Sequence, residues 1–128
     1  SLVKPQNPIP TTATLINNIT DHMVENSPPA NSVIKDFSKF SKGCILVGYN
    51  VGFDQKFIQQ AAKKVGIVFE NEIIDVLSLA KTQLKLTRYK LTDVVKRLEV
   101  SLEGAHRALA DATATAECFL KLCSKNFL

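Results

Sequence analysis

The stretch Glu-Gly-Ala-His-Arg-Ala-Leu-Ala-Asp-Ala at residues 103–112 decides how this chain is organised. It begins an alanine-rich segment whose apolar side chains recur every three or four residues, which predicts an amphipathic helix over about residues 105–123. His106 then lies in the first turn, and Asp111 shares a helical face with Thr115 and Cys118. This small-residue face leaves room for a ligand beside the carboxylate; alternatively, His106 and Asp111 are ordinary surface residues.

A second stretch, Cys-Ile-Leu-Val-Gly-Tyr-Asn-Val-Gly-Phe-Asp at residues 44–54, predicts a strand, a turn and a helix over about residues 51–65. The apolar run over residues 44–48 is too short for a helix, so we expect a central, parallel strand. Asp54 lies in the first helical turn, where it either favours the helix dipole or binds a ligand. We expect Asn50 to cap this helix or to orient Asp54. The side chains expected to be buried are Phe53, Phe57, Ile58 and Ala61.

The remaining elements follow from shorter patterns. Periodic apolar residues predict helices over residues 33–40, 75–85 and 91–98, and β-prone pieces at 67–69 and 73–74. Asn31 or Ser32 is expected to cap the first of these helices, because Pro28-Pro29 precedes it. Two shorter helical turns near the N-terminus are expected to have threonine caps: Thr11 or Thr12 for the first and Thr20 for the second.

The length and composition of the chain are typical of a single soluble domain. The 128 residues are 45% apolar and 22% charged, and the net charge of +4 permits nucleic acid as a partner without requiring it. Cys44, Cys118 and Cys123 lie in apolar patterns, which predicts buried, reduced thiols without disulfides. No apolar run is long enough to span a membrane and no secretion signal is recognisable, so we expect a cytoplasmic protein.

Three motifs in order resemble the DEDDh family of 3′ to 5′ exonucleases, which have a ribonuclease H-like α/β fold. They are Asn-x-x-Phe-Asp at residues 50–54, Ile-Asp-Val-Leu-x-Leu-Ala at 74–80 and His-x4-Asp at 106–111. The sequences around residues 47–57 and 75–80 are most similar to the proofreading domains of bacterial DNA polymerase III, especially the type embedded in a larger polymerase chain. The resemblance covers residues 2–122.

This resemblance implies hydrolysis of the terminal phosphodiester of single-stranded DNA with two Mg²⁺ or Mn²⁺ ions. It makes Asp54 and Asp111 metal ligands, which suits hard cations, and His106 the general base. The implied partners are a DNA 3′ end and the rest of a DNA polymerase chain or complex, with no membrane. Trimming of RNA remains an alternative. RNA differs from DNA by its 2′-hydroxyl, and no residue of this sequence indicates whether that group is recognised.

One family motif is absent, however. The family takes its other ligands from an Asp-x-Glu on its first strand, and these 128 residues contain no Asp-x-Glu. We therefore expect residues 1–128 to be a partial, helix-rich exonuclease domain that is truncated at its N-terminus and inactive alone. The strand at residues 44–48 would then have an unpaired edge that favours homo-oligomers or completion by another segment. The alternative function is a non-catalytic module that binds nucleic acid or docks on a polymerase.

Positive charge is concentrated between residues 81 and 97, a segment that contains six basic residues and a single acidic residue, Asp93. These residues are either solvated or follow phosphates, with Tyr89 near enough to stack on a base. Asp75 is expected to have a structural role. The candidate nucleic-acid contacts over the whole chain are Thr20, His22, Phe53, Lys85, Arg88 and Arg107.

Overall fold

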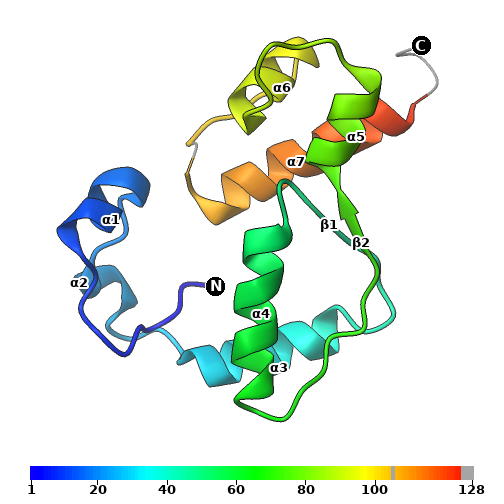
Figure 1. The fold of residues 1–128 in the computed structure, drawn as a ribbon. Helices are drawn as coiled ribbons and strands as arrows, with labels where there is room; N and C mark the ends of the chain where they lie inside the picture. Colours follow the sequence, from blue (N-terminus) through cyan, green and yellow to red (C-terminus); the bar gives the residue numbers. More distant parts are fainter. Residues whose placement is uncertain (105, 125–128) are drawn as a thin grey trace. The chain divides into compact units, whose positions relative to one another are not determined.

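The structure, a computed structural model, describes residues 1–104 and 106–124. Its elements are helices and two short strands (Figure 1), in the order α1 Thr11–Asn17, α2 Asp21–Val24, α3 Ala30–Phe40, β1 Leu46–Gly48, α4 Gly52–Lys63, β2 Ile73–Asp75, α5 Val76–Gln83, α6 Leu91–Arg97 and α7 Ala108–Cys123. The chain divides into two compact units. Unit 1 contains residues 1–44 and 52–71, and unit 2 contains residues 45–51 and the described part of 72–128.

The sheet belongs to unit 2. β1 and β2 pair in parallel, with Leu46 opposite Ile73 and Gly48 opposite Asp75, which confirms that the strand predicted at residues 44–48 has a parallel neighbour. β1 begins two residues later than expected, because Cys44 ends a turn in which its N–H donates to the Ser41 carbonyl at 3.0 Å. Within the described residues β1 has a neighbour along one edge only, so the expected central position is not observed. The β-prone piece at residues 67–69 forms no strand.

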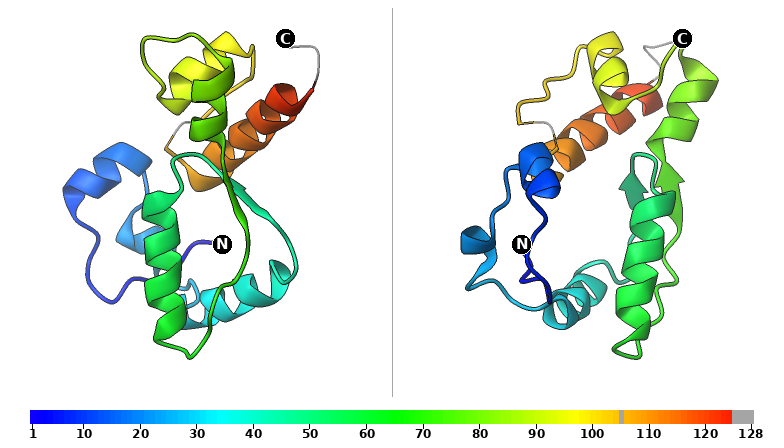
Figure 2. Two further views of the ribbon diagram at one scale, coloured as in Figure 1. Left: turned by 45° about the vertical axis from the view of Figure 1, so that its right-hand side comes forward. Right: turned by 60° about the vertical axis from the view of Figure 1, so that its left-hand side comes forward.

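The core of unit 2 is built around α7. Its buried face consists of Ala114, Thr115, Cys118 and Leu122, and α5, α6 and β1 all contact the helix (Figure 2). The buried apolar residues of α5 and α6 complete this core: Val76, Ala80, Val94 and Val95. The helix begins at Ala108 instead of residue 105, because Gly104 and His106 have positive φ angles of 74° and 67°. Such left-handed backbone cannot continue a right-handed helix.

Unit 1 has a smaller core. α3 packs on α4, and the buried apolar residues of this unit are Val24, Ile34 and Ala62. The rings of Phe37 and Phe69 stack with centroids 5.5 Å apart and join α3 to the loop after α4. Among the described residues, unit 1 therefore buries fewer apolar side chains than unit 2.

The expected burial of α4 is wrong for its aromatic residues. Phe53 and Phe57 are 68% and 58% exposed, and Ala62 is the buried residue of this helix. Within unit 1 the packing partner of α4 is α3, and this contact leaves both aromatic side chains exposed. An amphipathic pattern identifies a helix without saying how much of its apolar face finds a partner.

Two expected helix caps are also wrong. The N-cap positions of α1 and α3 are Pro10 and Pro29, and neither helix has a side-chain cap. Both prolines have extended backbone that leads directly into a helix, so Asn31 and Ser32 lie inside the first turn of α3. The third cap is confirmed: the Thr20 side chain accepts the Met23 N–H at the start of α2.

Only one of the three cysteines is buried as expected. Cys118 is fully buried against the core, whereas Cys44 and Cys123 are exposed. Burial, with a smaller contribution from the nearby Glu117 charge, raises the pKa of the Cys118 thiol to about 11. In the described part of the chain, no helix combines the length and apolar character needed to cross a membrane.

Thiol accessibility tests this core. At pH 8 we expect an aromatic disulfide reagent to label Cys44 and Cys123 in the folded protein at least about 100-fold faster than Cys118, because burial suppresses both access and thiolate formation. Release of the coloured thiolate measures each rate, and a Cys118→Ala variant should lose only the slow phase. Three equal rates in the folded protein would contradict the assigned core.

Candidate active site

Asp111 and His106 meet at the N-terminus of α7. The His106 backbone N–H donates to Asp111 Oδ1 at 3.3 Å, and the Asp111 N–H donates to the Arg107 carbonyl at 3.0 Å. Arg107 is the N-cap residue and provides no side-chain cap. The Asp111 carboxylate therefore orders the chain that enters its own helix, and its negative charge suits the helix dipole.

His106 is held in an unusual backbone conformation. Its φ of 67° lies in the left-handed region, which costs a non-glycine residue of order 1 kcal/mol or more. Its side chain is exposed. The structure thus presents an imidazole to solvent from a turn that is fixed by the Asp111 carboxylate.

The turn after β1 is fixed by a second carboxylate. Asp75 Oδ1 accepts the Asn50 N–H at 2.8 Å and the Leu77 N–H at 3.0 Å, so it caps α5 and holds the turn at once. These bonds support the structural role expected for Asp75. Asn50 has a positive φ of 55° and lies two residues before α4, so it does not occupy the capping position adjacent to the helix.

Asp54 belongs to unit 1, whereas Asp111 and His106 belong to unit 2. Its exposed side chain lies in the first turn of α4, next to Phe53. The rings of Phe53 and Phe57 approach to 4.7 Å between centroids. An exposed carboxylate beside an exposed aromatic pair could meet a charged, planar ligand.

Metal binding needs more donors than these. Carboxylate oxygens are the correct kind of ligand for Mg²⁺ or Mn²⁺. Among residues 1–104 and 106–124, however, no group of three or more His, Cys, Asp or Glu side chains is arranged to hold a metal ion. The candidate ligands therefore fit such an ion in kind but are too few in number.

The other candidate contacts lie on surfaces of both units. Thr20 is occupied as the cap of α2, and His22 lies 3.4 Å from Glu25 in an exposed pair. Lys85 is exposed between α5 and α6, as is Arg88, which reaches Asp93 at 3.5 Å. Exposed pairs of this kind contribute little to stability, so Arg88 remains available to a phosphate.

Two tyrosines form a connection that the sequence did not reveal. The Tyr49 hydroxyl donates to the Tyr89 carbonyl at 2.6 Å, and the Tyr89 hydroxyl donates to the Leu84 carbonyl at 2.7 Å. Burial raises the pKa of Tyr49 to about 12, with smaller effects of Cys118, Asp75 and Asp93. The Tyr89 ring is partly buried and packs against the core, so stacking of this ring on a base stays an untested alternative.

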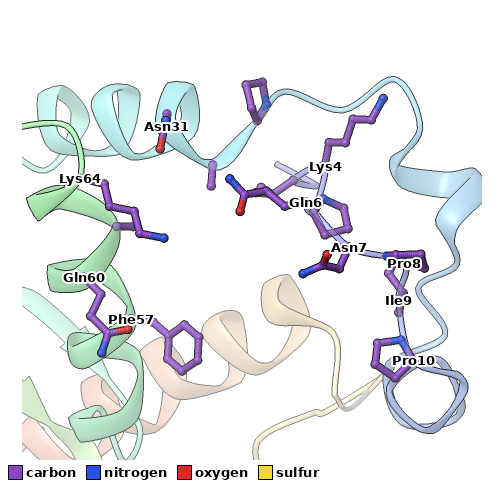
Figure 3. Close-up of a pocket in the computed structure, with 15 residues that line it drawn as sticks. Lys4, Gln6, Asn7, Pro8, Ile9, Pro10, Asn31, Phe57, Gln60 and Lys64 are labelled. Carbon is purple, nitrogen blue, oxygen red and sulfur yellow. The ribbon is translucent and has the colours of Figure 1, made fainter.

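A cavity of about 630 Å³ lies within unit 1, between the extended segment 3–10, the start of α3 and one side of α4. Figure 3 shows Phe57 of α4 and Lys64, the residue after this helix, facing Gln6 and Asn7 across it. Of the described residues that line this cavity, none carries a carboxylate, and Asp54 is not among them. The cavity therefore provides amides and ammonium groups, which suit an anion better than a metal ion.

Comparison with known proteins identifies relatives over nearly the whole chain. A family model described as exonuclease (RNase_T) matches residues 1–119. The chain is 40% identical to a PolC-type DNA polymerase III of Caldanaerobacter subterraneus over 98% of its length, and 39% identical to that of Thermotoga maritima over 94%. It spans only 9% of each of these relatives. A DNA polymerase III subunit epsilon-like protein of Rhodobacter capsulatus is 34% identical over 95% of the chain and 18% of the relative.

The chain is also similar in fold to a solved structure over its whole length. Exonuclease X, in complex with 5′ overhanging duplex DNA, superposes with a TM-score of 0.75 at 24% identity, covering 100% of this chain and 74% of that one. The likeness shows a common fold. The predicted ribonuclease H-like α/β fold is thereby confirmed.

Backbone strain at His106 can be measured directly. Because glycine adopts positive φ without steric cost, we expect His106→Gly to raise the free energy of unfolding by up to about 1 kcal/mol relative to His106→Ala. Both variants lose the imidazole and keep the N–H that Asp111 accepts. Urea denaturation measures the difference, and an alanine variant as stable as the glycine variant would show that this turn is unstrained.

Proposed function

This chain belongs to the exonuclease family whose model matches residues 1–119, and we propose that it contributes to a 3′ to 5′ exonuclease acting on single-stranded DNA. Membership confirms the resemblance inferred from the three motifs. The observation that carries the proposal is the turn in which Asp111 fixes the backbone of His106 and leaves its imidazole exposed. A general base must be exposed to the water that it deprotonates.

Each site residue has a defined task in this proposal. Asp54 and Asp111 would supply carboxylate oxygens to Mg²⁺ or Mn²⁺, two ions in the complete site. Such ions would supply activation of the attacking water and charge stabilisation at the leaving oxygen. The His106 imidazole accepts a proton from that water. The hydrogen bond from the Asn50 N–H to Asp75 Oδ1 fixes the backbone conformation of the turn before α4.

The chain by itself should not catalyse this reaction. Asp54 and Asp111 are too few for a pair of metal ions, and the described residues form no cluster that supplies the rest. The missing carboxylates would therefore come from another polypeptide segment. Among residues 1–104 and 106–124, no strand pairs with the second edge of β1, and such a segment or a second copy of the chain would pair there.

A second candidate function is a non-catalytic module that binds nucleic acid or docks on a polymerase. The absence of a cluster of metal ligands within residues 1–104 and 106–124 favours it, as does the excess of positive charge between residues 81 and 97. The relatives are named as DNA polymerase III, which supports a replicative polymerase chain or complex as partner and a cytoplasmic location. RNA is the alternative substrate.

A chimera separates the catalytic and non-catalytic proposals. Incubated with Mn²⁺ and a 5′-labelled single strand, this chain alone should release no 3′ nucleotides. Fused behind the Asp-x-Glu strand of a PolC-type relative, it should trim the strand, and Asp54→Asn or His106→Ala should reduce that rate at least about 1,000-fold. Asp36→Asn, in the exposed part of α3, is the matched control. Trimming that survives both site substitutions would refute the proposed roles.

Salt dependence tests the proposed phosphate contacts. Binding of single-stranded DNA should weaken linearly on a logarithmic salt scale, with a slope of about −0.7 for each phosphate neutralised. Replacing Lys85 and Arg88 by Gln should therefore reduce the magnitude of the slope by about 1.4. Replacing Lys35 and Lys39 of α3, which are equally exposed, should leave it unchanged. Fluorescence anisotropy gives the slopes; equal losses in both double variants would indicate unspecific attraction.

A further inference from the structure

The two residues on either side of Lys85 are both hydrogen-bonded to the Tyr89 hydroxyl. The Tyr89 hydroxyl donates to the Leu84 carbonyl at 2.7 Å and accepts the Leu86 N–H at 3.2 Å. Leu84 and Leu86 are the immediate neighbours of Lys85 in the chain. The backbone on both sides of this exposed lysine is therefore fixed to a ring that packs on the core.

The same tyrosine is fixed to the turn that follows β1. The Tyr49 hydroxyl donates to the Tyr89 carbonyl at 2.6 Å across forty residues of sequence. The next residue, Asn50, donates its N–H to Asp75 Oδ1 at 2.8 Å. The end of β1, the start of α5 and the loop that carries Lys85 are thus connected by a continuous series of hydrogen bonds within unit 2.

Both tyrosines are partly buried, so these bonds are shielded from water. A shielded hydrogen bond is stronger than an exposed one. Removing one partner leaves the other donor or acceptor buried without a hydrogen bond, which is costly. The connection also persists over the working pH range, since the raised pKa keeps the Tyr49 hydroxyl protonated well above pH 9. A flexible loop would have to be ordered by each ligand that bound it, whereas this loop is already ordered.

We propose that Tyr49 and Tyr89 are positioning residues that hold Lys85 in a fixed place relative to the turn after β1, so that the ammonium meets a phosphate of a bound nucleic-acid strand without reordering the loop. The inference rests on the proposed function. It adds a role for two side chains that are not placed at the reacting atoms. A purely structural role would predict lost stability upon substitution and no change in what Lys85 contributes to binding.

A double-mutant cycle distinguishes these roles. In the otherwise unchanged chain, Lys85→Gln should weaken binding of a labelled single strand about threefold at low salt. In a Tyr49→Phe or Tyr89→Phe background the same substitution should cost less than about 1.5-fold, because the lysine is no longer pre-positioned. Lys35→Gln is the control and should cost the same in every background. Thr113→Val, which removes an exposed hydroxyl bond on α7, controls for general loss of a hydrogen bond.

Hydrogen exchange supplies a readout that needs no nucleic acid. Tyr49→Phe, which leaves the Tyr89 hydroxyl intact, should still speed exchange of the Leu86 amide severalfold, since Tyr89 loses its anchor. If the Lys85 effect is equal in all backgrounds, or if Leu86 exchange is unaffected by Tyr49→Phe, the positioning role is overturned while the proposed function stands. If the unchanged chain binds no single strand, both the proposed phosphate contact and the positioning role are overturned.

Discussion

The packing of one face of α7 supports everything else in unit 2. Ala114 and Cys118 are completely buried there, and their small side chains let β1, α5 and α6 approach the same helix. Burial of a larger side chain such as Leu122 contributes roughly 2 kcal/mol, so the face as a whole accounts for much of the stability of this unit. Because Asp111 lies in the first turn of this helix, the Asp111–His106 part of the candidate site is attached to the core of unit 2.

The site residues combine structural and chemical tasks. Asp111 orders the turn that carries His106, and Asp75 orders the turn that follows β1. A carboxylate has two oxygens and several lone pairs, so accepting a backbone N–H does not prevent it from also binding a cation. Asp75 uses one oxygen for two backbone donors, which fits a residue whose role is to define shape.

The sequence predicted the elements and the order of the motifs well. Periodicity is a local property, so helices α3 to α7 follow from residues that are close in the chain. The pairing of β1 with β2 joins strands on either side of α4 and does not follow from local patterns. The motifs around Asp54 and Asp111 likewise identified the family without coordinates. Local patterns could not predict which apolar residues find partners: Phe53 and Phe57 have a core-like spacing and are nevertheless exposed.

The sequence by itself therefore determined the α/β class, the exonuclease family and the candidate residues His106, Asp54 and Asp111, because each depends on residue type and short spacing. Only the tertiary structure decided how the turns are held. The bond from Tyr49 to the Tyr89 carbonyl and the bond from the Asn50 N–H to Asp75 join chain segments that meet only after folding. Hydrogen bonds act over about 3 Å in space whatever the separation in sequence, and this is why no local pattern reveals them.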